Sequence, residues 1–398
     1  MDYNPRIVFV TDIVTPYTVA VMDELAQLVD LTVIFCASTS TRGCDWALDG
    51  LNFRHVVIDG LAVKRADPDR IDYYLDPRIL VHIARLRPDV IIGAGWSVPT
   101  WYGALYCMVS GTALVIHSDG TLLTERDLSA VQRTSRSMLV RLATGFAANS
   151  RQAAQRFIDL GAAPASVHAA PHSTNLEPFW QVGKRRFAEA TRPHRSGGGG
   201  LHILMAGRLV ERKGFAAVLP AIADAQAVEP GIRVSIAGSG PQEQQLRRLA
   251  ADLGVSVEFL GFVDQPDLAA VCAEADTFVF PSTQDEFGFT LLEAMAAGMA
   301  CVASPYAGAT GDLIVDGDNG VVIDPRDRRR VADALVSMAR QPAVRQRLGR
   351  RAHVSSLERT PRRTAAGYVA AANAAARRRR ARRGWRGARR MPLRQNSY

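Results

Sequence analysis

The first half of the chain alternates short apolar runs with segments whose apolar residues recur at helical spacing. Tyr17–Leu28 is such a segment, and it places Val19, Met22 and Leu25 on one face of a helix. The apolar runs have the length of buried strands and lie at Arg6–Val10, Leu31–Phe35, Asp89–Ile92, Ala113–His117 and Gly145–Asn149. Strands that alternate with helices predict a parallel sheet covered by helices on both faces.

The second half of the chain repeats this alternation and ends in predicted helices. Its strand-length runs are Leu201–Ala206, Arg233–Ala237, Val257–Leu260, Thr277–Phe280 and Ala300–Ala303. Helical segments follow at Asp327–Met338, Pro342–Leu348 and Ala365–Ala376. Residues 183–200 are basic and then rich in glycine, which is typical of a flexible linker. The pattern predicts two α/β domains, at 1–182 and 201–376, and a basic tail at 377–398.

The length of 398 residues is sufficient for two domains that each bury a core. Residues 90–118 contain no Asp, Glu, Lys or Arg, which is long enough to suggest a membrane span. Because Gly93, Gly95 and Pro99 interrupt the stretch, it predicts a strand, a loop, a helix and a second strand instead. The five cysteines form no paired motif and the first residues lack a signal-peptide pattern, so we expect a cytoplasmic protein.

The net charge of +9 comes from the end of the chain. Residues 377–398 contain ten Arg and no acidic residue, so the remaining chain has a formal charge of −1. Basic residues around Trp385 suit an anionic membrane surface or a nucleic acid, and a solvated tail is a third alternative. We favour the membrane surface for Arg377–Arg394 and expect no nucleic acid partner.

One motif combines an acidic turn, a glycine and a short helix. Asp285 and Glu286 place two carboxylates in the turn, and Gly288 allows the backbone to approach a ligand closely. The helix predicted at Thr290–Ala297 begins with unpaired N–H groups and the positive end of its dipole, which suit an anion. Glu293, one turn further along, is placed to accept hydrogen bonds from hydroxyl groups. These features together are typical of a cradle for a sugar nucleotide.

A second motif follows the strand predicted at Leu201–Ala206. It places Arg208 and Lys213 between Gly207 and Gly214. An Arg guanidinium binds phosphate through two parallel hydrogen bonds, and a Lys ammonium adds a compact positive charge. The motif therefore predicts a phosphate-binding loop.

The two motifs together resemble those of the retaining GT-B glycosyltransferases of family four. The F-G pair at Phe287 and the E-A-M-A segment at Glu293 match the E-x7-E region of that family. The first acidic position is Asp285, where the family has Glu, and Glu286 stands where Gly is common, so either carboxylate could meet the donor sugar. The resemblance implies two Rossmann-like domains that face an interdomain cleft.

The resemblance also implies roles for individual residues. The catalytic residues would be Asp285, Glu286, Glu293 and His117. The donor diphosphate would be bound by Gly207, Arg208, Lys213, Gly288, Phe289, Thr290 and Leu291. The nucleotide base would lie along Gly238, Gly261, Phe262 and Val263.

His117 ends the strand predicted at Ala113–His117. The carboxyl end of a parallel strand faces the crevice in which open α/β sheets bind ligands. A structural role for a single histidine is the alternative, and the resemblance favours a position near the donor sugar.

We expect neither a metal nor a cofactor besides the nucleotide sugar. Residues 11–16, after the first predicted strand, contain no glycine, which argues against a dinucleotide-binding motif and a dehydrogenase. D-x-D matches at Asp67 and Asp316 lie in a proline loop and an Asn-Gly turn, and no His/Cys cluster has metal-ligand spacing.

The sequence thus predicts a metal-independent, retaining transferase that moves sugar from a UDP- or GDP-sugar to a glycan or lipid-linked acceptor. Two alternatives remain open. One is a sugar-nucleotide epimerase or hydrolase of the same fold, and the other is a non-catalytic binding protein that acts through its Arg-rich tail.

Overall fold

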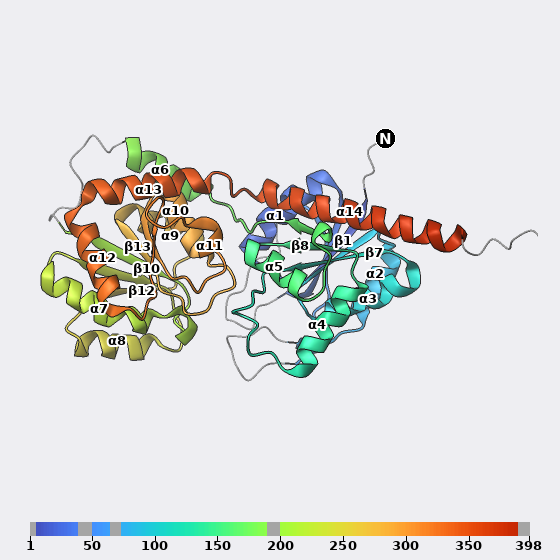
Figure 1. Ribbon diagram of the computed structural model, residues 1–398, viewed down its shortest axis with the longest axis horizontal. Helices are drawn as coiled ribbons and strands as arrows, with labels where there is room; N and C mark the ends of the chain where they lie inside the picture. Colours follow the sequence, from blue (N-terminus) through green and yellow to red (C-terminus); the bar gives the residue numbers. More distant parts are fainter. Residues whose placement is uncertain (1–4, 39–49, 64–72, 189–199, 389–398) are drawn as a thin grey trace, which may run out of the picture. The chain divides into compact units, whose positions relative to one another are not determined.

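The computed structural model describes residues 5–38, 50–63, 73–188 and 200–388, without the side chains of residues 382–388. The chain forms two compact units (Figure 1). Unit 1 comprises Met1–Gly120, Asp127–His172 and Pro361–Tyr398. Unit 2 comprises Thr121–Arg126 and Ser173–Thr360.

Unit 1 is built on a sheet of seven parallel strands. The strands, in sheet order, are β3 (Arg54–Val57), β2 (Asp30–Ala37), β1 (Arg6–Ile13), β6 (Val90–Ala94), β7 (Ala113–Ser118), β8 (Gly145–Ala148) and β9 (Val167–Ala169). In the register, Ile7 of β1 lies beside Leu31 on one side and Val90 on the other. A separate antiparallel pair consists of β4 (Ala62–Val63) and β5 (Tyr73–Tyr74).

Helices cover both faces of this sheet, as the alternating pattern predicts. Ile7 and Phe9 of β1 pack into the core on one face, while Val8 and Val10 pack into the core on the other. The first face is covered by α1 (Pro16–Leu28) and α14 (Pro361–Ala388). The second face is covered by α2 (Arg78–Leu86), α3 (Val98–Ser110), α4 (Ala130–Leu142) and α5 (Arg151–Asp159), and a short 3-10 turn η1 (Pro164–Ser166) precedes β9.

The uncharged stretch at residues 90–118 forms β6, α3 and β7, as predicted from its glycines and proline. Among the described residues, no helix combines the length and the apolar character that crossing a bilayer requires.

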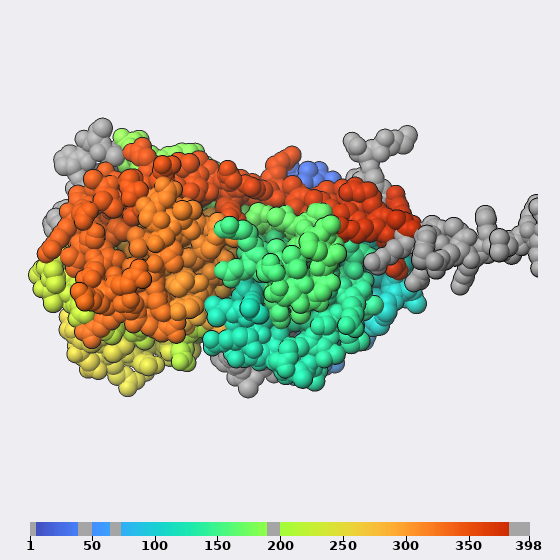
Figure 2. Space-filling model, in the orientation of Figure 1, coloured from blue at the N-terminus to red at the C-terminus, as the bar shows by residue number. Residues whose placement is uncertain are grey.

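The last helix, α14, differs from the predicted division because it returns to unit 1. Ala371 and Ala375 are fully buried against the first sheet, and a side chain at Gly145 would press against Ala375. Small residues on both sides therefore let α14 lie close to the strands. Figure 2 shows the red C-terminal segment directly against the green and cyan surface of unit 1. An alanine-rich helix carries no pattern that indicates which sheet it covers. Its place in the sequence alone predicts that it belongs to the second domain.

Unit 2 contains a second, six-stranded parallel sheet. Its strands, in sheet order, are β12 (Val257–Gly261), β11 (Arg233–Ala237), β10 (His202–Ala206), β13 (Thr277–Phe280), β14 (Ala300–Ala303) and β15 (Val321–Val322). In both sheets the order reverses beside the first strand, at β1/β6 in unit 1 and at β10/β13 in unit 2. Such a reversal is the topological switch point of a doubly wound sheet.

The strand β10 also alternates between two cores. Leu204 and Ala206 face one core, and Ile203 and Met205 face the other. The first core includes α6 (Glu177–Ala188), α9 (Gln265–Glu274), α10 (Phe289–Ala296), α11 (Thr310–Leu313) and α13 (Pro342–Ser356). The second includes α7 (Phe215–Val228), α8 (Glu243–Asp252) and α12 (Arg328–Arg340), and a 3-10 turn η2 (Glu211–Lys213) precedes α7.

The linker predicted at residues 183–200 begins as helix. α6 continues to Ala188 because Arg186 donates hydrogen bonds to the carbonyls of Cys272, at 2.6 Å, and Ala297, at 3.2 Å. These bonds anchor the last turn of α6 to unit 2. Residues 197–199 of the glycine run, which we expect to act as a hinge, lie outside the described residues.

Candidate functional site

The two predicted motifs of unit 2 meet at the switch point of its sheet. β10 and β13 are hydrogen-bonded neighbours, with Leu204 beside Phe278. The loop with Arg208 follows β10, and the turn with Asp285 follows β13. Because parallel strands end at the same edge of the sheet, the two loops lie side by side where open α/β sheets bind ligands.

Glycines allow the loops to approach each other closely. Gly214 has a φ of 71°, and a side chain on it would collide with the carbonyl of Pro281. Gly238, after β11, has a φ of 145°, and a side chain there would collide with the carbonyl of Gly207. Close packing between backbones therefore requires glycine at both positions. From the sequence motifs alone, these glycines could equally have served to bring the backbone close to a ligand.

Arg212 joins the loop after β10 to the turn after β13. Its carbonyl accepts hydrogen bonds from the amides of Thr283, at 2.8 Å, and Gln284, at 3.2 Å. The Thr283 hydroxyl donates to the same carbonyl at 3.2 Å. These hydrogen bonds hold the loop that carries Lys213 against the turn that carries Asp285.

Lys213 and Asp285 form an ion pair inside this arrangement. The Lys213 ammonium donates to Oδ2 of Asp285, and the Ser282 hydroxyl lies 3.4 Å from the same oxygen. Side-chain exposure is 8% for Asp285 but 48% for Glu286, whose carboxylate lies 3.9 Å from Arg212. The structure thus distinguishes the two adjacent acids, because Asp285 faces inward and Glu286 faces outward.

The helix α10 begins beside the ion pair. Gly288 has a φ of 96°, and an added Cβ would collide with the ring of Phe280. The helix starts at Phe289, one residue before the prediction, and the Thr290 hydroxyl donates to the carbonyl of Ala206 at 3.2 Å. This bond ties the start of α10 to the end of β10. Leu291 lies in the core, and its amide donates to the Gly288 carbonyl at 3.1 Å.

Glu293 is a buried carboxyl in the next turn of α10. Nε2 of Gln265 donates to its Oε1 at 2.7 Å and also contacts the Thr174 hydroxyl at 3.1 Å. Burial raises the pKa of Glu293 to about 7, and the hydrogen bond from Gln265 opposes this shift. Sequence reasoning missed Gln265 and Thr174, although Gln265 opens the helix that follows the Gly261 motif.

The segment predicted to contact the base follows β12. Gly261 has a φ of 70°, and its carbonyl accepts a hydrogen bond from the Gly238 amide at 2.6 Å. Phe262 is exposed, while Val263 packs against the core beneath α9 and α10. Gly238 and Gly261 are thus adjacent at the same sheet edge as half-buried Arg208.

His117 lies in unit 1, at the end of β7. Its ring packs edge-to-face against the rings of Tyr368 and His172, with centroid distances of 5.2 and 5.9 Å. Burial, reinforced by His172, lowers the pKa of His117 to about 4, and Asp119 opposes this shift. His117 is therefore neutral at pH 7. Tyr368 carried no motif that could have indicated its position.

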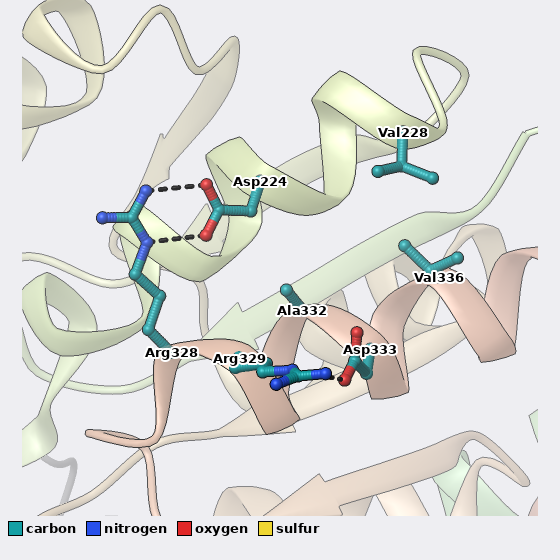
Figure 3. Close-up of a pocket in the computed structure, with 7 residues that line it drawn as sticks. All are labelled: Asp224, Val228, Arg328, Arg329, Ala332, Asp333 and Val336. Carbon is teal, nitrogen blue, oxygen red and sulfur yellow. Dashed lines mark hydrogen bonds and ion pairs between the residues drawn. The ribbon is translucent and has the colours of Figure 1, made fainter.

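A hollow of about 320 Å³ between α7 and α12 lies apart from these loops (Figure 3). Arg328 donates two hydrogen bonds to Asp224, at 2.6 and 2.7 Å, and Val228 and Val336 line the hollow. The hollow shares no residue with the predicted site and lies toward the end of α7 that is remote from Gly214.

Within the described part of the chain, no group of three or more His, Cys, Asp or Glu side chains is arranged to hold a metal ion. Arg212 and Lys213 place two positive charges beside the acidic turn.

Residues 187–354 match the family "Glycosyl transferases group 1", which confirms the resemblance predicted from the motifs. The lipopolysaccharide core biosynthesis glycosyltransferase LpsE of Rhizobium meliloti is 36% identical over 155 residues, 38% of this chain and 43% of that protein. The D-inositol 3-phosphate glycosyltransferase of Pseudarthrobacter chlorophenolicus is 33% identical over 223 residues, 54% of this chain and 52% of that protein. The chain thus spans about half the length of these curated relatives.

Solved structures match nearly the whole chain. HepE of Anabaena, in complex with UDP and glucose, has a TM-score of 0.69 at 18% identity and covers 92% of this chain and 98% of its own. Sucrose-phosphate synthase of Thermosynechococcus elongatus has a TM-score of 0.67 at 18% identity, and the match covers 96% of this chain and 99% of the synthase. These likenesses, together with two parallel sheets, confirm the predicted GT-B fold class.

Proposed function

We propose, from the membership of residues 187–354 in the group 1 glycosyl transferases, that the protein is a retaining, metal-independent glycosyltransferase. It transfers a sugar from a UDP- or GDP-sugar to a hydroxyl of a glycan or lipid-linked acceptor. The inward-facing pair of Lys213 and Asp285 at the start of α10 carries this proposal. It combines a cation for a diphosphate with a carboxylate for sugar hydroxyls at the switch point of the sheet.

Departure of the nucleotide leaves negative charge on the diphosphate. Arg208, Lys213 and the first amides of α10 stabilise that charge, which is the part a metal ion plays in other transferases. When the donor binds, its phosphates compete for Lys213 and release Asp285 to the sugar. Burial favours Asp285 over Glu286 for this contact, and Glu293 binds the ribose hydroxyls.

The relatives support the substrate classes in this proposal. HepE is described in complex with UDP-glucose, and LpsE is named for lipopolysaccharide core biosynthesis. A phosphatidyl-myo-inositol mannosyltransferase is also similar, at 37% identity over 150 residues. A nucleotide sugar as donor and a polysaccharide or envelope glycolipid as product agree with these names.

We further propose that unit 1 docks on the cytoplasmic face of an anionic membrane through the end of α14. Arg377 and Arg380 are exposed on this helix, and Arg379 is hydrogen-bonded to the Gly111 carbonyl at the end of α3. Met108 and Val109, in that last turn of α3, are exposed apolar residues. Basic and apolar side chains side by side suit a lipid surface.

The test compares Asp285→Asn with Glu286→Gln while UDP or GDP release is measured with and without acceptor. We expect Asp285→Asn to lose transfer on the order of a hundredfold or more, because it removes a contact to the reacting sugar. Glu286→Gln, a matched loss of charge at the next position, retains transfer within about tenfold.

Release that needs no acceptor would favour an epimerase or hydrolase. A wild-type protein that neither releases nor transfers anything, yet binds acceptors through its Arg-rich end, would favour the binding protein. Equal losses in the two variants would contradict the assignment of Asp285.

A further inference from the structure

A cluster of polar side chains lies at the carboxyl ends of β7, β8 and β9 in unit 1. His117 ends β7, Asn149 follows β8, and His172 lies beyond β9. Nε2 of His172 contacts the Asn149 amide and lies 3.5 Å from a carboxylate oxygen of Asp119. The fifth member, Tyr368, comes from α14 at the far end of the chain. Four segments of unit 1 therefore converge on one sheet edge.

Tyr368 touches the ring of His117 with its hydroxyl. The oxygen lies 3.1 Å from Nδ1 and 3.3 Å from Nε2. Tyr368 is buried and packs edge-to-face on Phe9 of β1, with a centroid distance of 5.4 Å, so its position is fixed on both sides. Burial raises the pKa of Tyr368, so the phenol keeps its proton and can donate it in a hydrogen bond.

The His117 ring also contacts the backbone of β8. The carbonyl of Ala147, its register partner in the sheet, accepts a hydrogen bond from the imidazole. A neutral imidazole has one donor and one acceptor nitrogen. The carbonyl is an acceptor for the protonated nitrogen, and the phenol can donate to the other nitrogen, so together they hold the neutral ring in place.

We propose that Tyr368 is a positioning residue for His117, because its phenol holds the neutral imidazole in the orientation that it presents to the substrate. The inference rests on the proposed glycosyl transfer, in which the family resemblance gives His117 a role near the donor sugar. It assigns a function to α14 that no motif indicates: the last helix completes the site on unit 1. The charged and titratable groups that face His117 are Tyr368, His172 and Asp119, while β1 contributes the uncharged Phe9.

The test uses Tyr368→Phe, which retains the ring packing and removes only the hydroxyl. Tyr102→Phe is the matched control, since the Tyr102 hydroxyl also bonds within unit 1, to the carbonyl of Leu75 at 2.7 Å. Nitrogen-15 NMR of the His117 ring in the full-length protein reports the tautomer and the pKa. We expect Tyr368→Phe to raise the pKa of His117, because the neutral ring loses a hydrogen-bond donor.

In transfer assays, Tyr368→Phe should lower kcat about tenfold or more while the donor KM stays within about threefold. Tyr102→Phe should leave kcat and the His117 spectrum unchanged. In a His117→Ala background the effect of Tyr368→Phe on kcat should disappear, since a positioning residue acts through its partner.

An unchanged pKa of His117 in Tyr368→Phe would overturn the proposal, and so would an altered spectrum with wild-type kcat. The NMR comparison requires no activity, so it separates this inference from the proposed function. If the wild type transfers no sugar, the function fails, while an altered spectrum would still support the Tyr368 contact.

Discussion

Glu293 shows how burial and a single hydrogen bond set the charge of a candidate site residue. The carboxyl is 2% exposed and contacts the amide of Gln265 at 2.7 Å. Its pKa of about 7 lies above the ordinary value of 4.5, so the folded protein favours the protonated form. Stability from this group is full below the unfolded pKa and is lost as the pH rises from about 4.5 to about 7.

Replacing Glu293 with Gln should therefore remove a pH-dependent cost of folding. Near pH 4.5 the variant and the wild type should have similar free energies of unfolding. At pH 8 Glu293→Gln should be more stable by roughly 3 kcal/mol, because no buried carboxylate has to ionise. Urea unfolding at the two pH values measures the difference, and thermal shift with UDP or GDP should show weaker nucleotide binding in the variant.

A stability difference that stays constant between pH 4.5 and 8 would contradict the raised pKa. If Glu293→Gln bound UDP or GDP as tightly as the wild type, the assignment of Glu293 to the ribose hydroxyls would be contradicted.

Single residues differ in how far the sequence predicts their partners. Lys213 and Asp285 could be predicted to converge because each follows a strand, and the two strands are neighbours in a parallel sheet. Gln265 and Tyr368 could not, because their contacts depend on how α9 and α14 pack. The choice between Asp285 and Glu286 also required side-chain directions, which a two-residue acidic turn does not specify.

At the scale of elements, α10 depends on the glycine before it. Gly288 combines a positive φ, which disfavours side chains, with close contact to the ring of Phe280. The helix that follows is tied to the end of β10 by the bond from the Thr290 hydroxyl to the Ala206 carbonyl. A side chain at this position would therefore affect both folding and donor binding.

Gly288→Ala should cost roughly 2–4 kcal/mol of stability, from backbone strain and collision with the Phe280 ring. Gly317→Ala is the matched control, because Gly317 has a φ of 77° and open space around its Cβ position. The control should cost only about 1 kcal/mol, from backbone strain alone. Chemical unfolding measures both, and equal losses would show that the contact with Phe280 has no effect.

The elements themselves were largely predictable from hydrophobic spacing. Strand-length runs became β1, β2, β6, β7 and β8 in unit 1, and β10 to β14 in unit 2. Two helices differ from the prediction: α6 extends further than expected, and α14 packs on the other sheet. In both, contacts with residues distant in sequence explain the difference. Arg186 anchors α6 to carbonyls that lie about a hundred residues away in sequence, and buried alanines place α14 on the first sheet.

At the scale of the molecule, some of the arginines near the chain end form hydrogen bonds within unit 1. Arg378 donates to the carbonyls of Thr144 and Ala165, and Arg379 to those of Cys107 and Gly111. Arg377 and Arg380 stay exposed on the same helix. The arginine run thus both fastens α14 to unit 1 and presents charge to the surroundings.

Reversing Arg377 and Arg380 to Glu should weaken binding of the full-length protein to vesicles of phosphatidylcholine with phosphatidylglycerol. Each basic residue near an anionic surface contributes on the order of 1 kcal/mol, so we expect a loss of tenfold or more in co-sedimentation. The control reverses Arg329 and Arg330 on α12, two exposed arginines of unit 2, with the same change of net charge. Equal losses in both proteins would indicate a dependence on net charge alone.

The position of α14 also has a consequence for synthesis on the ribosome. The chain leaves unit 1 after His172 and returns to it at Pro361, when all of unit 2 has been made. Until then the face formed by Ile7, Phe9 and Ala147 has α1 but lacks α14, the second helix that covers it. Unit 1 therefore cannot complete its fold before unit 2 has been synthesised, and part of its apolar face is accessible to chaperones during that time.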